Sequence, residues 1–265
     1  MEKPNLLNNE LKVWQLGEHL LIQGDSTKAD TFEILNSLGL RASYLLSDIP
    51  YGVAYTESKI SFGRNPKKSK DIQNDAYQSP DQYKNFCIKW LTAVKPYMAD
   101  KNVIHIFNSD RMLFSLHDAM QESGYRFSQL LIWIKNQSVI GRLDYNVQHE
   151  LIIYGWLGTH NFYGSKDKSV FCYPRPQSSP CHPTTKPVGL LRQLILNSSR
   201  VNDIVLDPFI GSGSTLWACI DTHRRCVGVE IDSEYCNSII QRFEKLTGIK
   251  TKEINCFAER RLNDL

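Results

Sequence analysis

The stretch Ile204-Val205-Leu206-Asp207-Pro208-Phe209-Ile210-Gly211-Ser212-Gly213-Ser214-Thr215 decides the fold. Its first four residues predict a buried strand, Phe209–Gly213 a tight turn, and Ser214–Thr222 the helix that follows. A second apolar run, Cys226–Ile231, predicts the next strand. Together these segments form a βαβ unit. Its glycines let the backbone approach a ligand closely, and the helix N-terminus offers free N–H groups.

Residues around the glycines indicate which class of ligand this unit binds. A carboxylate at Glu230 can accept both hydroxyls of a ribose, which indicates a nucleoside-bearing cofactor. Leu216 stands where dinucleotide-binding turns carry a third glycine, and Asp207-Pro208-Phe209 precedes the first one. A ligand without a pyrophosphate has less need of that third close approach. NAD and a purely structural turn remain alternatives at this level.

Further apolar runs along the chain predict the rest of a sheet. Helical patterns separate most of them, and this alternation favours an α/β fold with a largely parallel sheet that helices cover on both faces. The runs are His19–Gln23, Tyr44–Ser47, Val103–Phe107, Leu130–Ile134 and Leu151–Gly155.

Three helices have clear start signals. Each predicted helix begins with Ser or Asp as its N-cap, and a glycine ends the second and the third. The first also has Gln82 at the capping-box position. The helices are expected over Ser79–Tyr97, Asp110–Glu122 and Asp232–Leu246.

The bulk composition is that of an ordinary soluble globular protein. The chain has 265 residues, of which 42% are hydrophobic and 22% charged, and this fits one domain. No apolar run is long enough to span a membrane, and the N-terminus lacks a secretory pattern, so we expect a cytoplasmic protein. Seven cysteines without a CxxC indicate reduced thiols. Cys172, Cys181 and His182 match no common zinc spacing, so no metal is expected.

Asp48-Ile49-Pro50-Tyr51 follows one of the apolar runs and therefore lies at the carboxyl end of a strand, where open α/β sheets bind ligands. An aromatic amino group is a poor nucleophile because its lone pair is delocalised into the ring. The Asp48 carboxylate and the Ile49 carbonyl can accept hydrogen bonds from such a group and orient its lone pair. Tyr51 can stack on a flat base. A common Asp-x-Pro turn is the structural alternative.

Two long polar stretches, Val53–Gln78 and Leu157–Pro180, interrupt the alternation. Loops of this length in a compact domain are usually functional or disordered. The first contains a basic cluster without an acidic residue, which can neutralise phosphates, although a solvated loop is the alternative from charge alone. This cluster consists of Lys59, Arg64, Lys67, Lys68 and Lys70.

These motifs, in this order, resemble the S-adenosylmethionine-dependent amino-methyltransferases of DNA, specifically their permuted β group. Asp48–Tyr51 resembles the catalytic Asp-Pro-Pro-Tyr, with Ile49 in place of the first proline. His182–Pro187 resembles the His-Pro-Thr-x-Lys-Pro motif, and Asp207–Thr215 resembles the Asp-Pro-Phe-x-Gly-Ser-Gly-Ser-Thr turn. Shorter likenesses occur at Gln23–Asp25, His149–Glu150, Tyr154–Trp156 and Gly228–Asp232.

The resemblance implies a Rossmann-like methyltransferase fold, with a mixed seven-stranded sheet that has one antiparallel strand near Leu151–Tyr154. It also implies a single domain over residues 1–265. Its parts are a catalytic half at 19–156, a basic DNA-contact loop at 53–78, a short target-recognition region at 157–181 and a cofactor-binding half at 182–248.

By the same resemblance, Asp48 and the Ile49 carbonyl hold the target amino group, and Tyr51 stacks on the base. Pro50 biases Ile49 toward an extended conformation, so the Ile49 carbonyl can be held in a fixed direction. The expected cofactor is S-adenosylmethionine. Its expected contacts are Asp25 near the adenine, Thr185 and Lys186 near the methionine, Glu230 at the ribose, and Asp207, Phe209, Gly211, Gly213, Ser214 and Thr215 around the turn.

The implied activity is site-specific methylation of adenine N6 in duplex DNA, by base flipping and direct transfer. The basic cluster, with Arg142, Lys166, Lys168 and Arg175, is expected to contact DNA. Cytosine N4 is the nearest alternative. Less favoured are an RNA methyltransferase, a nicotinamide-dependent oxidoreductase and a DNA-binding protein with a decayed site. A homodimer and a separate cognate restriction endonuclease are compatible with this reading.

Overall fold

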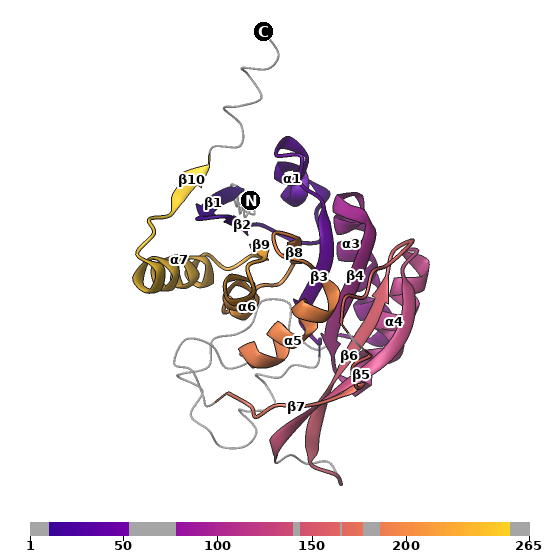
Figure 1. Ribbon diagram of the computed structural model, residues 1–265. Helices are drawn as coiled ribbons and strands as arrows, with labels where there is room; N and C mark the ends of the chain where they lie inside the picture. The colour runs from indigo at the N-terminus through magenta and orange to yellow at the C-terminus, as the bar shows by residue number, and fades with distance from the viewer. Residues whose placement is uncertain (1–10, 53–77, 140–143, 165, 177–185, 255–265) are drawn as a thin grey trace, which may run out of the picture.

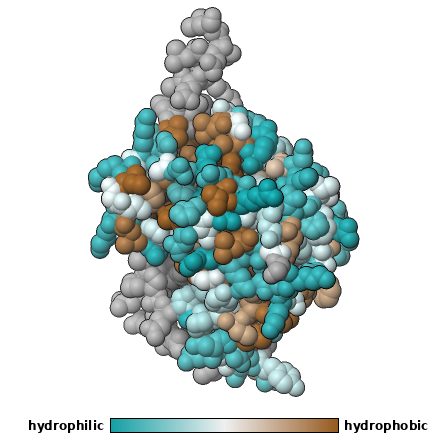
Figure 2. Space-filling model, in the orientation of Figure 1, coloured by the Kyte–Doolittle hydropathy of each residue, from teal (hydrophilic) through white to brown (hydrophobic). Residues whose placement is uncertain are grey.

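The computed structural model describes residues 11–52, 78–139, 144–164, 166–176 and 186–254 (Figure 1). Within these ranges, none of the helices combines the length and the apolar character that a membrane crossing requires. On the face in Figure 2 the described residues are mostly hydrophilic, and apolar side chains are scattered in small groups.

A mixed sheet forms the centre of the molecule, with strand order β10-β1-β2-β9-β8-β3-β4-β6-β5-β7. Only β1 and β6 run against the others among the described strands. The strands are β1 (Lys12–Leu16), β2 (His19–Gln23), β3 (Ala42–Asp48), β4 (Met98–Asn108), β5 (Arg126–Val139), β6 (Val147–Trp156), β7 (Val170–Cys172), β8 (Ile204–Asp207), β9 (Arg225–Glu230) and β10 (Lys252–Ile254).

The predicted count of seven strands is wrong, because the sheet formed by the described residues has ten. The seven central strands, β2 to β5 in sheet order, do contain a single antiparallel strand, β6, at the expected place. The additional strands are short and lie at the two edges. Two of them, β1 and β10, pair with each other, whereas β7 pairs with β5 inside the segment 157–180 that was expected to be a loop.

Helices cover both faces of this sheet, as the sequence predicts (Figure 1). One face packs against η1 (Ala29–Phe32), α1 (Glu33–Ser37), α3 (Pro80–Val94), η3 (Lys95–Tyr97), η4 (Asp110–Met112) and α4 (Leu113–Glu122). The other face packs against α5 (Val188–Ser198), α6 (Ser214–Thr222) and α7 (Ser233–Thr247). Buried aliphatic and aromatic residues fill both layers, so the sheet is sandwiched in the way that parallel sheets require.

Two of the three predicted helix starts are confirmed. Ser79 caps α3 with a full capping box, and the Asp232 carboxylate accepts a hydrogen bond from the first turn of α7. The third is wrong, because the chain enters α4 through the short helix η4 and Met112 occupies the N-cap. The Asp110 carboxylate instead accepts from its neighbour, the Arg111 N–H, at 2.9 Å.

The parallel neighbours β3 and β8 mark the point where the strand order of the sheet changes direction. From β8 the chain passes to α6 on one face, whereas the next described helix after β3, α3, lies on the other face. Neighbouring strands whose connections leave toward opposite faces open a crevice at their carboxyl ends. Asp48 ends β3 and Asp207 ends β8, so both quoted motifs border that crevice.

Candidate active site

The nucleoside side of the crevice is built by β8, β9 and the turn between β8 and α6. Gly211 and Gly213 have φ values of 53° and 80°, in the left-handed region that glycine adopts without strain. Gly228 in β9 is also required, because a Cβ there would lie 2.2 Å from Cδ1 of Ile210. The turn therefore lies directly on the strand that carries Glu230.

Glu230 holds the turn in place through its carboxylate. One oxygen accepts the Gly211 N–H at 3.0 Å and the other accepts the Asp232 N–H at 2.9 Å. Burial raises the pKa of Glu230 to about 7, although both backbone donors act to lower it. An acid at a strand end with lone pairs left over is suited to receive the hydroxyls of a ribose.

Asp207 joins three elements rather than pointing at open space. Its carboxylate accepts hydrogen bonds from the hydroxyls of Thr215, at 2.6 Å, and Ser47, at 2.8 Å, and from the Phe209 N–H at 3.1 Å. Burial raises the pKa of Asp207 to about 6. The bond to Ser47 connects β8 to β3 one residue before Asp48, so the two halves of the site are fixed relative to each other.

Two further contacts close the nucleoside side. The Ser26 hydroxyl donates to the Pro208 carbonyl, which places the predicted Asp25 beside the turn. Asp25 itself accepts from the Thr27 N–H at 2.9 Å. The ring of Phe209 packs against α3, at 5.6 Å from Trp90 and 5.8 Å from Phe86 between ring centroids.

On the catalytic side, Asp48 is surrounded by donors. The Tyr51 hydroxyl donates to one carboxylate oxygen at 2.9 Å, and the Nζ of Lys186 lies 2.5 Å from the other. Lys186 is 5% exposed, and it lies over the rings of Phe107 and Tyr51 at 5.1 and 5.7 Å from their centroids. The residue expected near the methionine thus has its ammonium against the Asp48 carboxylate.

A second carboxylate faces the same lysine. The Nζ of Lys186 lies 3.2 Å from Glu150, whose other oxygen pairs with the Nζ of Lys135 at 2.8 Å. The Tyr51 hydroxyl also lies 3.2 Å from Glu150. Lys135 comes from the end of β5 and Glu150 from the start of β6, which places both at the carboxyl edge of the parallel strands.

The two acids differ in their surroundings. Burial and the nearby Glu150 charge raise the pKa of Asp48, against the lowering effect of Lys186. Burial alone would raise the pKa of Glu150, but Lys186 and Lys135 together lower it. Glu150 therefore stays ionised more readily than Asp48 because it has two cationic partners rather than one.

Ile49 belongs to the apolar core that packs against α3, and it is 2% exposed. A proline at this position fixes the backbone through its ring. Here a buried side chain anchors the same peptide instead. The substitution of isoleucine for proline thus has a compensating contact.

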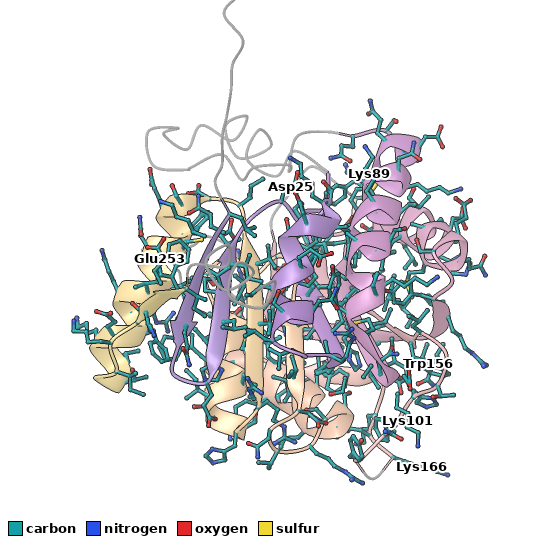
Figure 3. The ribbon with its side chains drawn as sticks, turned by 90° about the horizontal axis from the view of Figure 1, so that it is seen from above. Asp25, Lys89, Lys101, Trp156, Lys166 and Glu253 are labelled. Carbon is teal, nitrogen blue, oxygen red and sulfur yellow. The ribbon has the colours of Figure 1, made fainter. Side chains whose placement is uncertain are left out.

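The remaining predicted contact residues are only partly within the described residues, and those that are described lie in different parts of the molecule. Thr185, Arg142 and the five basic residues of 59–70 lie outside the described residues. The Gln78 N–H donates to the Gly52 carbonyl at 2.9 Å, so the two ends of the segment between them meet beside Tyr51. Lys166 and Lys168 precede β7, the last strand of the sheet order, and Figure 3 shows Lys166 far from Asp25. Arg175, which follows β7, donates its N–H to the Asn136 side chain at 2.9 Å.

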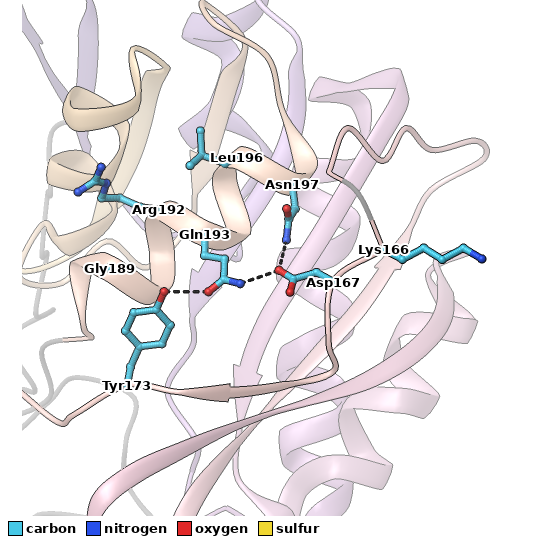
Figure 4. A pocket seen from close by; sticks show the side chains of 8 residues that line it. All are labelled: Lys166, Asp167, Tyr173, Gly189, Arg192, Gln193, Leu196 and Asn197. Carbon is cyan, nitrogen blue, oxygen red and sulfur yellow. Dashed lines mark hydrogen bonds between the residues drawn. The ribbon is translucent and has the colours of Figure 1, made fainter.

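A polar network anchors the segment around β7 to α5. Asp167 accepts from the side-chain amides of Gln193 and Asn197 at 2.6 and 2.8 Å, and Gln193 accepts from the Tyr173 hydroxyl at 2.8 Å (Figure 4). These side chains line a surface pocket of 480 Å³. The predicted recognition region therefore has a fixed attachment to the scaffold.

The sequence interpretation missed the roles of Lys135, Glu150 and Ser47. Glu150 lies in a strand that resembles the family, but no role was assigned to it. The available signal was a charged residue at the boundary of an apolar run, in both Lys135 and Glu150. Within the described residues, no cluster of His, Cys, Asp or Glu is arranged to hold a metal ion.

Comparison with known proteins agrees with this geometry. A family model described as DNA methylase, of the N6/N4 type, matches residues 43–242. That range includes Asp48, Lys186, Asp207 and Glu230. The chain belongs to the N6/N4 DNA methyltransferase family.

Similar curated proteins carry the same kind of name. The chain is 25% identical to the type II methyltransferase M2.MboI of Moraxella bovis over 189 residues, which cover 64% of this chain and 68% of that protein. It is 25% identical to M.HpaI of Haemophilus parainfluenzae, over 62% of this chain and 60% of that one, so the match spans less than two thirds of M.HpaI. A shorter match, 39% identical over 84 residues, is to the DNA adenine methyltransferase YhdJ of Escherichia coli, with 32% and 29% coverage.

Solved structures share the fold. The M1.HpyAVI–SAM complex aligns with a TM-score of 0.60 at 21% identity, covering 84% of this chain and 98% of that one. The cytosine-N4-specific PvuII DNA methyltransferase aligns with a TM-score of 0.65 at 14% identity, covering 92% and 89%. The extended sheet with helices on both faces is therefore a known methyltransferase architecture.

Proposed function

We propose that this protein methylates the N6 amino group of adenine in duplex DNA, with S-adenosylmethionine as the methyl donor. The observation that carries the proposal is the position of Asp48–Tyr51. This motif ends β3 directly beside the turn between β8 and α6, and the hydrogen bond from Ser47 to Asp207 ties the two together. An amino-holding site thus adjoins a nucleoside cradle across one crevice.

The cradle fits the proposed cofactor. Glu230 offers a carboxylate for the ribose hydroxyls, and the left-handed Gly211 and Gly213 leave room for close approach. The crystallised relative M1.HpyAVI, which shares the fold, is a SAM complex. When bound, S-adenosylmethionine supplies an electrophilic methyl group.

The protein's own groups then prepare the nucleophile. The Asp48 carboxylate and the Ile49 carbonyl accept the two N–H groups of the target, which directs the nitrogen lone pair toward the donor. Nitrogen gains a methyl group and loses one proton, and Asp48, whose pKa is raised, is suited to receive that proton. The Tyr51 ring provides the face on which a flipped base stacks.

Adenine is favoured over cytosine by two observations. The motif begins with Asp, as in adenine-specific members that the sequence resembles, and the relative YhdJ is named a DNA adenine methyltransferase. Cytosine N4 is the second candidate, since the PvuII enzyme with the same fold is cytosine-N4-specific.

The test uses purified full-length protein, S-adenosylmethionine labelled in its methyl group and unmethylated duplex DNA. Digestion to nucleosides should place the label on N6-methyl-2′-deoxyadenosine. Label on N4-methyl-2′-deoxycytidine would support the second candidate. DNA that stays unlabelled while the protein binds the cofactor would overturn both.

A further inference from the structure

Four charges, two buried lysines and two half-buried carboxylates, alternate in sign along the catalytic side of the crevice. The order is Asp48, Lys186, Glu150 and Lys135, with separations of 2.5, 3.2 and 2.8 Å between neighbouring charged atoms. Both lysines are nearly inaccessible, at 5% and 7% exposed. Buried charges are costly unless each is paired, and in this row each inner charge contacts two opposite ones.

The target amino group must find acceptor lone pairs on Asp48, but both of its oxygens already have a donor, Tyr51 on one and Lys186 on the other. A lysine with Asp48 as its only partner would compete directly with the substrate. It could not turn to water, because Phe107 and Tyr51 enclose its ammonium.

Glu150 changes this competition because it touches both donors. One of its oxygens lies 3.2 Å from the Nζ of Lys186 and 3.2 Å from the Tyr51 hydroxyl. When the substrate approaches Asp48, each donor has a second acceptor that is already in contact. Lys135 limits the attraction of Glu150 for Lys186 and Tyr51. Its ammonium pairs with the other Glu150 oxygen at 2.8 Å and balances the negative charge of Glu150.

We propose that Glu150 and Lys135 are positioning residues for methyl transfer. Glu150 shares Lys186 and the Tyr51 hydroxyl with Asp48, and Lys135 sets how far that sharing goes. This inference rests on the proposed role of Asp48 as the acceptor for the target amino group.

The proposal predicts opposite effects of two substitutions. In Glu150→Gln, Lys186 loses its second anion and stays on Asp48, so the pKa of Asp48 falls. In Lys135→Gln, Glu150 draws Lys186 away, and the pKa of Asp48 rises. Besides Lys186, Tyr51 and Glu150, Asp207 on the adjacent strand also acts electrostatically on Asp48, and it is unchanged in both variants.

The experiment measures kcat against pH at saturating S-adenosylmethionine and DNA for the wild type, both variants and the double variant. The acid limb should move by about half a pH unit or more, to lower pH in Glu150→Gln and to higher pH in Lys135→Gln. The double variant should return toward the wild type. Each single variant should lose about tenfold in kcat. Cofactor affinity, measured by calorimetry, should stay within about twofold of the wild type.

Two controls separate positioning from general damage. Lys135→Arg keeps the charge and should preserve the wild-type profile. Lys101→Gln makes the same change as Lys135→Gln on an exposed lysine near the amino end of β4 (Figure 3), and it should leave the profile unmoved. Should Lys135→Gln fail to fold, Glu150→Gln alone decides the matter through the direction of its shift.

Acid limbs that move in the same direction, or not at all, in variants that bind the cofactor normally would overturn the inference. A wild-type protein without transfer to DNA would overturn the proposed function instead.

Discussion

S-adenosylmethionine affinity should depend on pH through Glu230. Glu230 is 9% exposed, and burial raises the pKa of its carboxyl from 4.5 to about 7. That displacement corresponds to about 3 kcal/mol against ionisation in the empty site. Both oxygens already accept a backbone N–H, from Gly211 and Asp232. Two ribose hydroxyls can donate to the Glu230 oxygens only if the carboxyl is ionised. A proton on either oxygen would point at a group that is itself a hydrogen-bond donor.

The direction in which the cofactor Kd changes with pH follows from the raised pKa of Glu230. Below pH 7 most empty protein carries protonated Glu230, so binding must first remove that proton. The apparent Kd should therefore rise about tenfold for each pH unit below about 7 and level off above it. The stability of the empty protein has the opposite trend: the Glu230 contribution to the unfolding free energy is favourable below 4.5 and is lost as the pH rises through about 7.

Calorimetry between about pH 5.5 and pH 8, in buffers of different ionisation heat, measures both affinity and proton release. Glu230→Gln should bind weakly at every pH and lose the slope. Glu234→Gln is the matched control, because it makes the same change on an exposed residue of α7. A Kd that is the same at both ends of the range, without proton release, would refute the reasoning.

Further predictions concern the scaffold. Gly228→Ala should destabilise the protein by about 1–3 kcal/mol and weaken cofactor binding, because the new Cβ meets Ile210; chemical denaturation should show that Ile210→Ala restores part of the loss in the double variant. Ile49→Ala should cost about 2–5 kcal/mol in the same assay, whereas Ile49→Val should cost about 1 kcal/mol; equal small costs would mean that the side chain does not anchor the turn. Ser79→Ala should cost about 0.5–2 kcal/mol, and unchanged stability would argue against the capping box.

The sequence predicted the elements whose signals are local. The seven central strands are apolar runs, and the capping box of α3 is contained in four consecutive residues, so both could be located without knowledge of the fold. The edge strands β7 and β10 have three residues each and exist through their pairing partners. The predicted N-cap at Asp110 was wrong because the short helix η4 already begins there. Ser109 is the N-cap of η4, and Asp110 is its first residue.

The charged row at the catalytic site depends on sheet order. β6 lies between β4 and β5, which brings Glu150 within reach of Lys186, a residue 36 positions later in the sequence. The motifs locate Asp48 and Lys186 separately at the crevice. They do not show that one ammonium serves two carboxylates, because that contact joins three segments that are distant along the chain.

The central claim is that Asp48 holds an adenine amino group for methylation. Its most direct test compares wild type with Asp48→Asn in labelled methyl transfer to unmethylated duplex DNA, followed by nucleoside analysis. Asparagine keeps the shape but loses the anionic acceptor. The wild type should yield N6-methyl-2′-deoxyadenosine, and the variant should lose at least about a hundredfold in transfer while its cofactor affinity is retained. Transfer at the wild-type rate by Asp48→Asn would contradict the central claim.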